Sequence, residues 1–154
     1  MRTRTTLASL VLFLGGLAVC LAADLFMGTW KLNEGKSKFS PGATKNTTVV
    51  YQMVGDKVKV TVDGVDKDGK AIHSEWTGKF DGQEYPVTGD PMSDMRSYSK
   101  SGKHTLHLSV KKGGQEIVSG SIAVSADGKT RTVTTTGTDA SGNKMHNTAV
   151  YDKE

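Results

Sequence analysis

The stretch that decides the fold is Lys57-Val58-Lys59-Val60-Thr61-Val62, in which every second residue is valine. A β-strand through these residues presents one apolar face and one wet face. The same alternation returns in later runs, which place on one face Ile72, Ser74 and Trp76, then Leu106, Leu108 and Val110, then Val118, Gly120, Ile122 and Val124. The helical period of 3.6 residues is missing after residue 23, apart from one short helical turn expected over 33–38. The pattern predicts an all-β protein.

Turn signals separate these runs at intervals of about 12 to 15 residues, which leaves room for strands of roughly 6 to 10 residues. Glycine, with aspartate or serine beside it, suits the positive φ of hairpin turns. The signals are Gly55-Asp56, Asp68-Gly69, Asp81-Gly82, Ser101-Gly102, Gly113-Gly114, Asp127-Gly128 and Ser141-Gly142. The spacing predicts an antiparallel up-and-down meander of about 8–10 strands.

Strands that each carry one apolar face have to hide those faces together. Closing the meander into a barrel does this and removes the exposed sheet edges. A two-sheet sandwich is the alternative, but it needs crossover connections, and only Val87 to Asp94 is long enough for one. We therefore expect a closed β-barrel.

The first 23 residues carry the features of a secretory signal peptide. Arg2 and Arg4 are positive, residues 7–21 are apolar, and small residues precede a cleavage site near Ala23. We expect a signal peptide over 1–23, one barrel domain over 24–154, and export to the periplasm or the medium. Cys20 lies in the signal, and lipidation there is disfavoured because Val19 is bulky where a lipoprotein box needs a small residue.

Charge argues against a nucleic-acid partner. The formal net charge of the full chain is +4; without Arg2 and Arg4, 18 basic residues face 16 acidic ones, a balance of +2. Nucleic-acid binding needs a clustered basic stripe, and the longest local candidate is only Lys36-Ser37-Lys38. After the signal no run is apolar enough to span a bilayer as a helix.

The first strand after the signal contains Gly28-Thr29-Trp30. A Gly-x-Trp on the opening strand resembles the start of lipocalin-like (calycin) barrels, and the chain after the signal looks like small secreted bacterial lipocalin-like proteins of unassigned function. The resemblance implies that Trp30 plugs the closed end of the barrel. An indole is large enough to fill the taper, and its N–H can bond a nearby carbonyl. The resemblance carries no catalytic residues.

Catalytic and metal sites find little support in the residues. His104 and His107, three apart on a strand, point to opposite faces, and His73 and His107 should lie outside. The chain has no cysteine after Cys20, no nucleophile elbow and no phosphate-binding glycine loop. Its aspartates gather in turns, where hairpins favour them. We expect no enzyme activity, no metal and no cofactor.

The interior is the remaining candidate site. We expect a small, partly apolar ligand in the barrel, with Trp30 at its base, and guessed pocket or core residues Tyr51, Trp76, Tyr85, Tyr98, Leu106 and Leu108. The threonine-rich run 130–138 slightly favours a partly polar interior, but it could equally form an outward face with high β propensity. The segment Glu84–Met92 is expected to be a structured crossover or, as the sharper hypothesis, a flap at the mouth. One alternative is a secreted protein-binding module such as a protease inhibitor, with a filled core and an exposed apolar loop or N-terminal arm, for which Asp24–Met27 is the candidate. The last is a barrel enzyme, which needs inward-facing ionisable groups that the alternation does not securely indicate.

Overall fold

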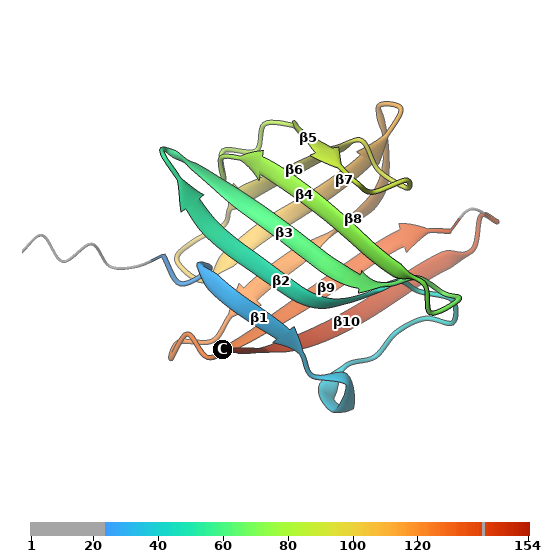
Figure 1. Ribbon diagram of the computed structural model, residues 1–154, viewed down its shortest axis with the longest axis horizontal. Helices are drawn as coiled ribbons and strands as arrows, with labels where there is room; N and C mark the ends of the chain where they lie inside the picture. Colours follow the sequence, from blue (N-terminus) through green and yellow to red (C-terminus); the bar gives the residue numbers. More distant parts are fainter. Residues whose placement is uncertain (1–23, 140) are drawn as a thin grey trace, which may run out of the picture.

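The computed structural model describes residues 24–139 and 141–154, so the expected signal peptide lies outside the described residues. These residues form an all-β barrel with one 3₁₀ turn, η1, at Glu34–Lys36, where the sequence predicted a short helical turn. The strands are β1 Gly28–Leu32, β2 Lys45–Val54, β3 Lys57–Val65, β4 Ala71–Gly78, β5 Tyr85–Thr88, β6 Met95–Lys100, β7 Thr105–Lys112, β8 Gln115–Val124, β9 Thr130–Thr138 and β10 Lys144–Lys153 (Figure 1).

The ten strands close into an antiparallel up-and-down barrel, in the order β1-β10-β9-β8-β7-β6-β5-β4-β3-β2. Closure depends on the short β1, in which Trp30 pairs with Val49 of β2 on one side and with Lys153 of β10 on the other. The expected barrel is confirmed, and the sandwich alternative is excluded because the sheet has no free edge.

The segment Glu84–Met92, expected to be a crossover or a flap, contains a strand. Tyr85–Thr88 forms β5, which pairs with β4 at Trp76 and Val87 and with β6 at Pro86 and Met95. Strands β5 and β6 are therefore neighbours, and the connection from Val87 to Asp94 is a hairpin turn rather than a crossover. The two ladders of β5 are short, since proline cannot donate a ladder hydrogen bond.

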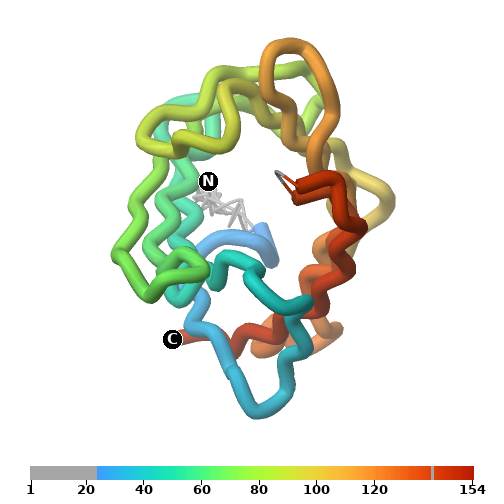
Figure 2. The backbone as a smooth tube through the Cα atoms, turned by 90° about the vertical axis from the view of Figure 1, so that its right-hand side faces the viewer, coloured from blue at the N-terminus to red at the C-terminus, as the bar shows by residue number. Residues whose placement is uncertain are grey.

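The two ends of the barrel differ. We call the base the end where the N-terminal segment and the turn after β2 lie, on the left of Figure 1. We call the mouth the opposite end, where η1 and the turn after β3 lie. Figure 2 looks into the mouth and shows the strands as a ring, with the blue N-terminal segment lying across it.

The predicted alternation places the expected side chains inside. Val58, Val60 and Val62 of β3 are buried, whereas Lys57 is exposed and Lys59 lies on the outer face beside Glu75. The predicted inward faces of β4, β7 and β8 are confirmed by the buried residues Trp76, Leu106 and Ile122. Each strand thus contributes alternate residues to one shared core.

Gly120 lies where β8 and β9 come close together. A Cβ at Gly120 would lie 2.1 Å from the carbonyl oxygen of Thr134 and 3.0 Å from the Cα of Thr135. The glycine in the apolar alternation of β8 is therefore required by the backbone of the neighbouring strand, which leaves no room for a side chain.

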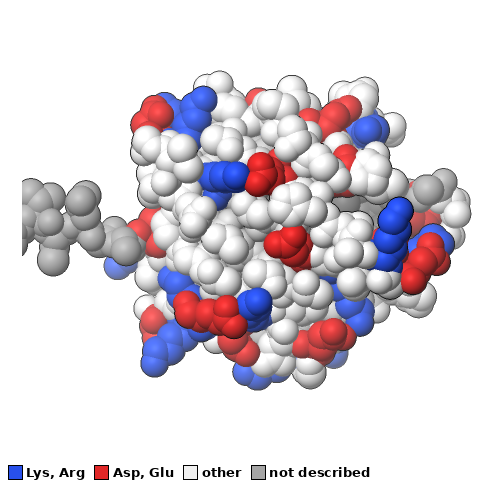
Figure 3. Space-filling view, in the orientation of Figure 1, with Lys and Arg blue, Asp and Glu red and all other residues white. Residues whose placement is uncertain are grey.

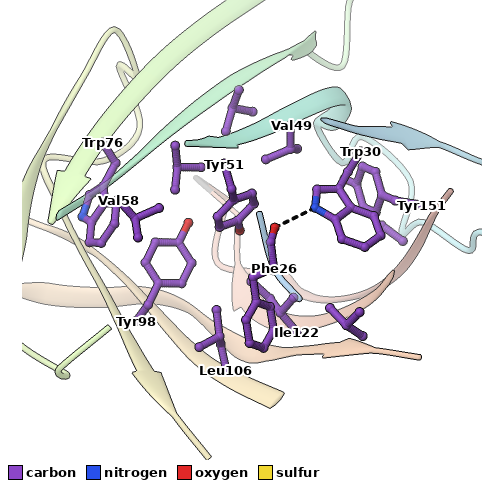
Figure 4. Close-up of a cluster of buried hydrophobic side chains, with 14 of the residues drawn as sticks. Phe26, Trp30, Val49, Tyr51, Val58, Trp76, Tyr98, Leu106, Ile122 and Tyr151 are labelled. Atoms are coloured by element: carbon purple, nitrogen blue, oxygen red, sulfur yellow. Dashed lines mark hydrogen bonds between the residues drawn. The ribbon is translucent and has the colours of Figure 1, made fainter. Parts of the chain in front are cut away.

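Trp30 closes the base. Its side chain is fully buried, and the indole N–H donates a hydrogen bond of 2.9 Å to the carbonyl oxygen of Phe26 (Figure 4). Phe26 is itself buried against Phe80, with ring centroids 6.0 Å apart. The expected role of Trp30 as a plug agrees with this position, because the indole both fills the end of the barrel and holds the N-terminal segment across it.

Replacing Trp30 tests the plug. Trp30→Ala should lower the free energy of unfolding by about 3–5 kcal/mol, since it removes a fully buried indole and leaves a cavity. Urea unfolding followed by circular dichroism measures the change. Met53→Ala is the control: Met53 is 57% exposed, so its loss should cost no more than about 0.5 kcal/mol. Equal losses in the two variants would contradict the assignment.

Candidate functional site

Five polar side chains meet inside the barrel, above the base. They are three tyrosines and two arginines, which we call the arginine–tyrosine belt: Tyr51 of β2, Arg96 and Tyr98 of β6, Arg131 of β9 and Tyr151 of β10. Strand register places them inward, because Arg131 pairs with Val124 and Tyr151, and Tyr98 pairs with Leu108. Figure 4 shows the Tyr51 ring between Tyr98 on one side and Trp30 and Tyr151 on the other.

Arg131 is the most enclosed charge of the belt, with 2% of its surface exposed. Its guanidinium carbon lies 4.4 Å from the ring centroid of Tyr151, 5.2 Å from that of Tyr51 and 5.3 Å from that of Trp30. The Nε and Nη1 atoms of Arg131 are buried and have no hydrogen-bond partner among the described residues. Aromatic faces, which attract a cation without accepting a directed hydrogen bond, form most of its surroundings, and the Tyr151 hydroxyl also interacts with the guanidinium.

Arg96 also points inward, and 12% of its side chain is exposed. Its Nη2 lies 3.8 Å from the Oδ2 of Asp90, in the turn between β5 and β6. The same carboxylate oxygen accepts a short hydrogen bond of 2.5 Å from the Ser93 hydroxyl. The Nε of Arg96 is buried without a partner among the described residues. Asp90 thus lies near only the Nη2 edge of this guanidinium.

Two tyrosines of the belt, Tyr51 and Tyr151, are held as neutral phenols. Burial raises the pKa of Tyr51 far above its ordinary value of 10.0, an effect that the neighbouring Tyr98 adds to and that Arg131 and Arg96 only partly oppose. Burial also raises the pKa of Tyr151, whose hydroxyl donates a 3.0 Å hydrogen bond to the carbonyl oxygen of Asn46. The belt therefore offers the interior two cations and neutral hydroxyls.

Some inward-facing residues on the mouth side of the belt keep exposed surface, although Val110, nearer still to the mouth on β7, is buried. Leu106 is fully buried toward the base, but Leu108, two residues nearer the mouth on β7, is only half-buried. Val118 of β8 and Thr135 of β9 are likewise half-buried, although their register places them inside. Solvent-accessible apolar side chains on the inner wall are what a ligand-binding barrel presents.

The residues singled out from the sequence gather in one core. Trp30, Tyr51, Trp76, Tyr98 and Leu106 are buried in it, and Leu108 and Tyr85 pack against it half-buried. The Tyr85 hydroxyl donates to Asp81 at 2.9 Å, and Tyr85 pairs directly with Arg96 of the belt. Their role in ligand binding stays a prediction.

Both belt arginines were missed by sequence reasoning. The expectation that the alternation indicates no inward-facing ionisable group is wrong. The signal was available, since Arg131 stands two residues before the inward Val133, and Arg96 two before the inward Tyr98. Of the two readings of the threonines in 130–138, the outward face fits most of them, because the register turns Thr132, Thr134 and Thr136 outward and only Thr135 inward.

The outer wall carries a separate cleft of about 530 Å³. It lies over β6 to β9, and mostly hydroxyl side chains line it, together with His107 and Glu116. A second cleft, of about 580 Å³, lies at the mouth between the segment after η1 and the turn after β3. His73 and His107 are exposed, as predicted, and His73 Nδ1 lies 2.7 Å from Asp63.

Charges on the face seen in Figure 3 are interspersed in sign, with lysines and arginines beside aspartates and glutamates. Within residues 24–139 and 141–154, no cluster of three histidine, cysteine, aspartate or glutamate side chains has a geometry that suits a metal ion. In the same part of the chain, no helix has the length and apolar character needed to cross a membrane.

The segment Asp24–Met27 is not an exposed arm. Phe26 is 1% exposed within the core, and its backbone N–H bonds the Asp24 carboxylate at 3.1 Å. Lys100 pairs with the same carboxylate group at 2.8 Å. The protein-binding alternative thus loses Asp24–Met27 as its contact arm, and the exposed apolar side chains of Met53, Val54 and Met92 are what it would use as a loop.

No family model matches the chain, and no curated protein is significantly similar to it in sequence. Among solved structures, EF1p2_mFAP2b bound to DFHBI is similar with a TM-score of 0.53 and 11% identity, over 86% of this chain and 97% of that one. A redesigned β-barrel, mFAP1, bound to DFHBI, has a TM-score of 0.49 and 17% identity, over 86% and 98% of the two chains. The likeness to the first barrel supports the closed β-barrel fold.

The buried phenols predict a loss of stability in alkali. The folded-state pKa of Tyr51 is raised above the unfolded value near 10.0. The contribution of Tyr51 to the free energy of unfolding is therefore fully present below pH 10 and is lost as the pH rises above that value. Tyr51→Phe should therefore reduce the decline of the unfolding free energy, by up to about 1.4 kcal/mol per pH unit above 10.

Urea unfolding of both proteins at pH 9, 10 and 11 measures the difference. Absorbance of phenolate in the folded protein is the independent control. Ionisation of all four tyrosines near pH 10 without unfolding would contradict the burial of Tyr51 and Tyr151.

Proposed function

We propose that this protein is an exported, non-catalytic barrel that binds a small, partly apolar molecule in its interior, entered from the mouth. The observation that carries the proposal is a group of inward-facing apolar residues that keep exposed surface. Leu108, Val118 and Val133 are half-buried, whereas Leu106, Ile122 and Val110 on the same wall are buried. Burial of that surface against a ligand would contribute about 25 cal/mol per Å² before the costs of association.

The belt gives this proposed site a polar floor. Ligand sites combine apolar walls with a few polar groups that fix orientation, and here Tyr51 and Tyr98 stand beside two arginines. The aromatic base beneath, where the Trp76 and Tyr98 rings lie 4.7 Å apart, holds that floor in place. The similar barrel with DFHBI bound makes that dye a suitable second probe.

Two adjacent threonines of β9 allow a matched test, because Thr135 faces the interior and Thr134 lines the outer cleft. The purified protein should raise and blue-shift the fluorescence of the neutral dye Nile red. Thr135→Phe should abolish this gain by filling the interior, and Thr134→Phe should leave it unchanged. Circular dichroism controls for folding of both variants.

If Thr134→Phe abolished the fluorescence gain and Thr135→Phe left it unchanged, binding would lie in the outer cleft and the interior site would be overturned. A wild-type protein that binds neither Nile red nor DFHBI would overturn ligand binding itself. Thr135→Val is the volume-matched control for Thr135→Phe. It removes the hydroxyl at nearly constant volume, so the protein should still bind the neutral dye.

Export is proposed on the charged, apolar and small-residue pattern of residues 1–23. Cleavage after Ala23 would leave intact the segment that caps the base, since its first contact is the Asp24 carboxylate with the Phe26 N–H. The intact mass of protein secreted by the host should correspond to a chain beginning at Asp24. A mass that retains Cys20 with an acyl group would instead indicate a lipoprotein.

A further inference from the structure

Exposed apolar side chains gather at one point of the base. Among the described residues, the large hydrophobic side chains that stand exposed are Met53 at 57%, Val54 at 52% and Met92 at 57%. Met53 and Val54 are consecutive residues at the tip of the β2–β3 hairpin, whereas Met92 lies at the mouth, in the turn between β5 and β6. Single exposed hydrophobic residues are ordinary on protein surfaces, but an adjacent pair at a turn suits contact with an apolar partner.

Met53 and Val54 point to opposite sides of the hairpin. Met53 pairs with Val58, which faces inward, and Val54 pairs with Lys57, which faces outward. Because successive side chains of a strand face opposite ways, a protein surface packed against one side of the tip would cover one of them and leave the other in water. A medium that surrounds the tip covers both. The interface of a lipid bilayer is such a medium.

The charges at this tip suit anionic lipid headgroups. The Asp56 carboxylate, in the turn itself, is neutralised by Lys79, whose Nζ lies 2.6 Å from its Oδ2. Lys57 is exposed and has no carboxylate partner among the described residues. The tip therefore combines two exposed apolar side chains with one free positive charge beside them, which is the combination that binds anionic bilayers at their surface.

The N-terminal segment enters the barrel at the same end. The Asp24 carboxylate is the first contact of the described chain, and it pairs at 2.8 Å with Lys100, the last residue of β6. The apolar residues 7–21 stand shortly before Asp24 in the sequence. A chain that carries those residues into a membrane presents its base to the lipid surface and its mouth to the water (Figure 1).

We propose that the base is a membrane-docking face, on which Met53 and Val54 enter the interface of an anionic bilayer and Lys57 lies at the lipid phosphates. The mouth then points away from the bilayer and stays open to the aqueous side. This inference goes beyond the proposed function, since docking through the hairpin tip needs no ligand in the interior.

Oxidation of the two exposed methionines tests the docking face within one molecule. Hydrogen peroxide converts accessible methionine to its sulfoxide, and Met53 and Met92 are exposed to the same extent. The chain from Asp24 onward contains the complete closed barrel, and its use prevents residues 7–21 from binding the lipid. Vesicles of phosphatidylethanolamine and phosphatidylglycerol should slow the oxidation of Met53 several-fold and leave that of Met92 unchanged, as measured by peptide mass spectrometry.

Three variants connect vesicle binding to the tip. Met53→Ser and Val54→Ser should each lower the affinity for these vesicles about three- to tenfold in co-sedimentation, because each removes apolar surface that the lipid buries. Met92→Ser is the matched control: it makes the same change at the other end of the barrel and should bind as the wild type does. Circular dichroism checks that all three variants fold.

Other results would overturn the proposal. Equal protection of Met53 and Met92, vesicle binding that survives in both tip variants, or no vesicle binding at all would each exclude the tip as a docking face. A wild-type dimer that separates in the tip variants, measured by sedimentation without lipid, would assign the tip to a second copy of this chain instead. Nile red binding in the interior is independent of these outcomes, so the proposed function is tested separately.

Discussion

Closure of the sheet through β1 is the constraint on which the rest of the structure depends. This strand has only five residues, yet it joins β2 to β10 and carries Trp30 inward. The indole hydrogen bond to Phe26 then holds the N-terminal segment across the base. Because the sheet has no edge, every second side chain is confined to one interior, and a charged residue placed on an inward position cannot reach bulk water sideways.

Much of this arrangement could be predicted from the sequence. Regular alternation, as in Lys57–Val62, needs only local pattern, and the glycine turns between runs set the hairpin order. The Gly28-x-Trp30 motif indicated the plug. Strand β5 could not be predicted as easily, because Pro86 lacks the N–H that a ladder hydrogen bond needs. The strand forms because β4 and β6 pair with it on either side.

The belt was harder to predict for a different reason. Arginine next to threonine in β9 looks like the wet face of a strand, and composition gives no sign that the charge is enclosed. What encloses Arg131 are three aromatic rings from β1, β2 and β10, and their convergence is a property of closure rather than of any local run. Threonines were a poor guide to a polar interior, because β-branched hydroxyl residues suit an outer face equally well.

Places where a protein departs from the pattern of its own fold are where function is expected. Here the alternation is kept by valine, leucine and aromatic residues almost throughout, and it is broken on the inner face by Arg96 and Arg131. The base needs neither charge, since Trp30, Phe26 and Trp76 already fill it. Folding alone therefore does not require these charges, whose unpartnered N–H groups lie in the interior that we propose as the ligand site.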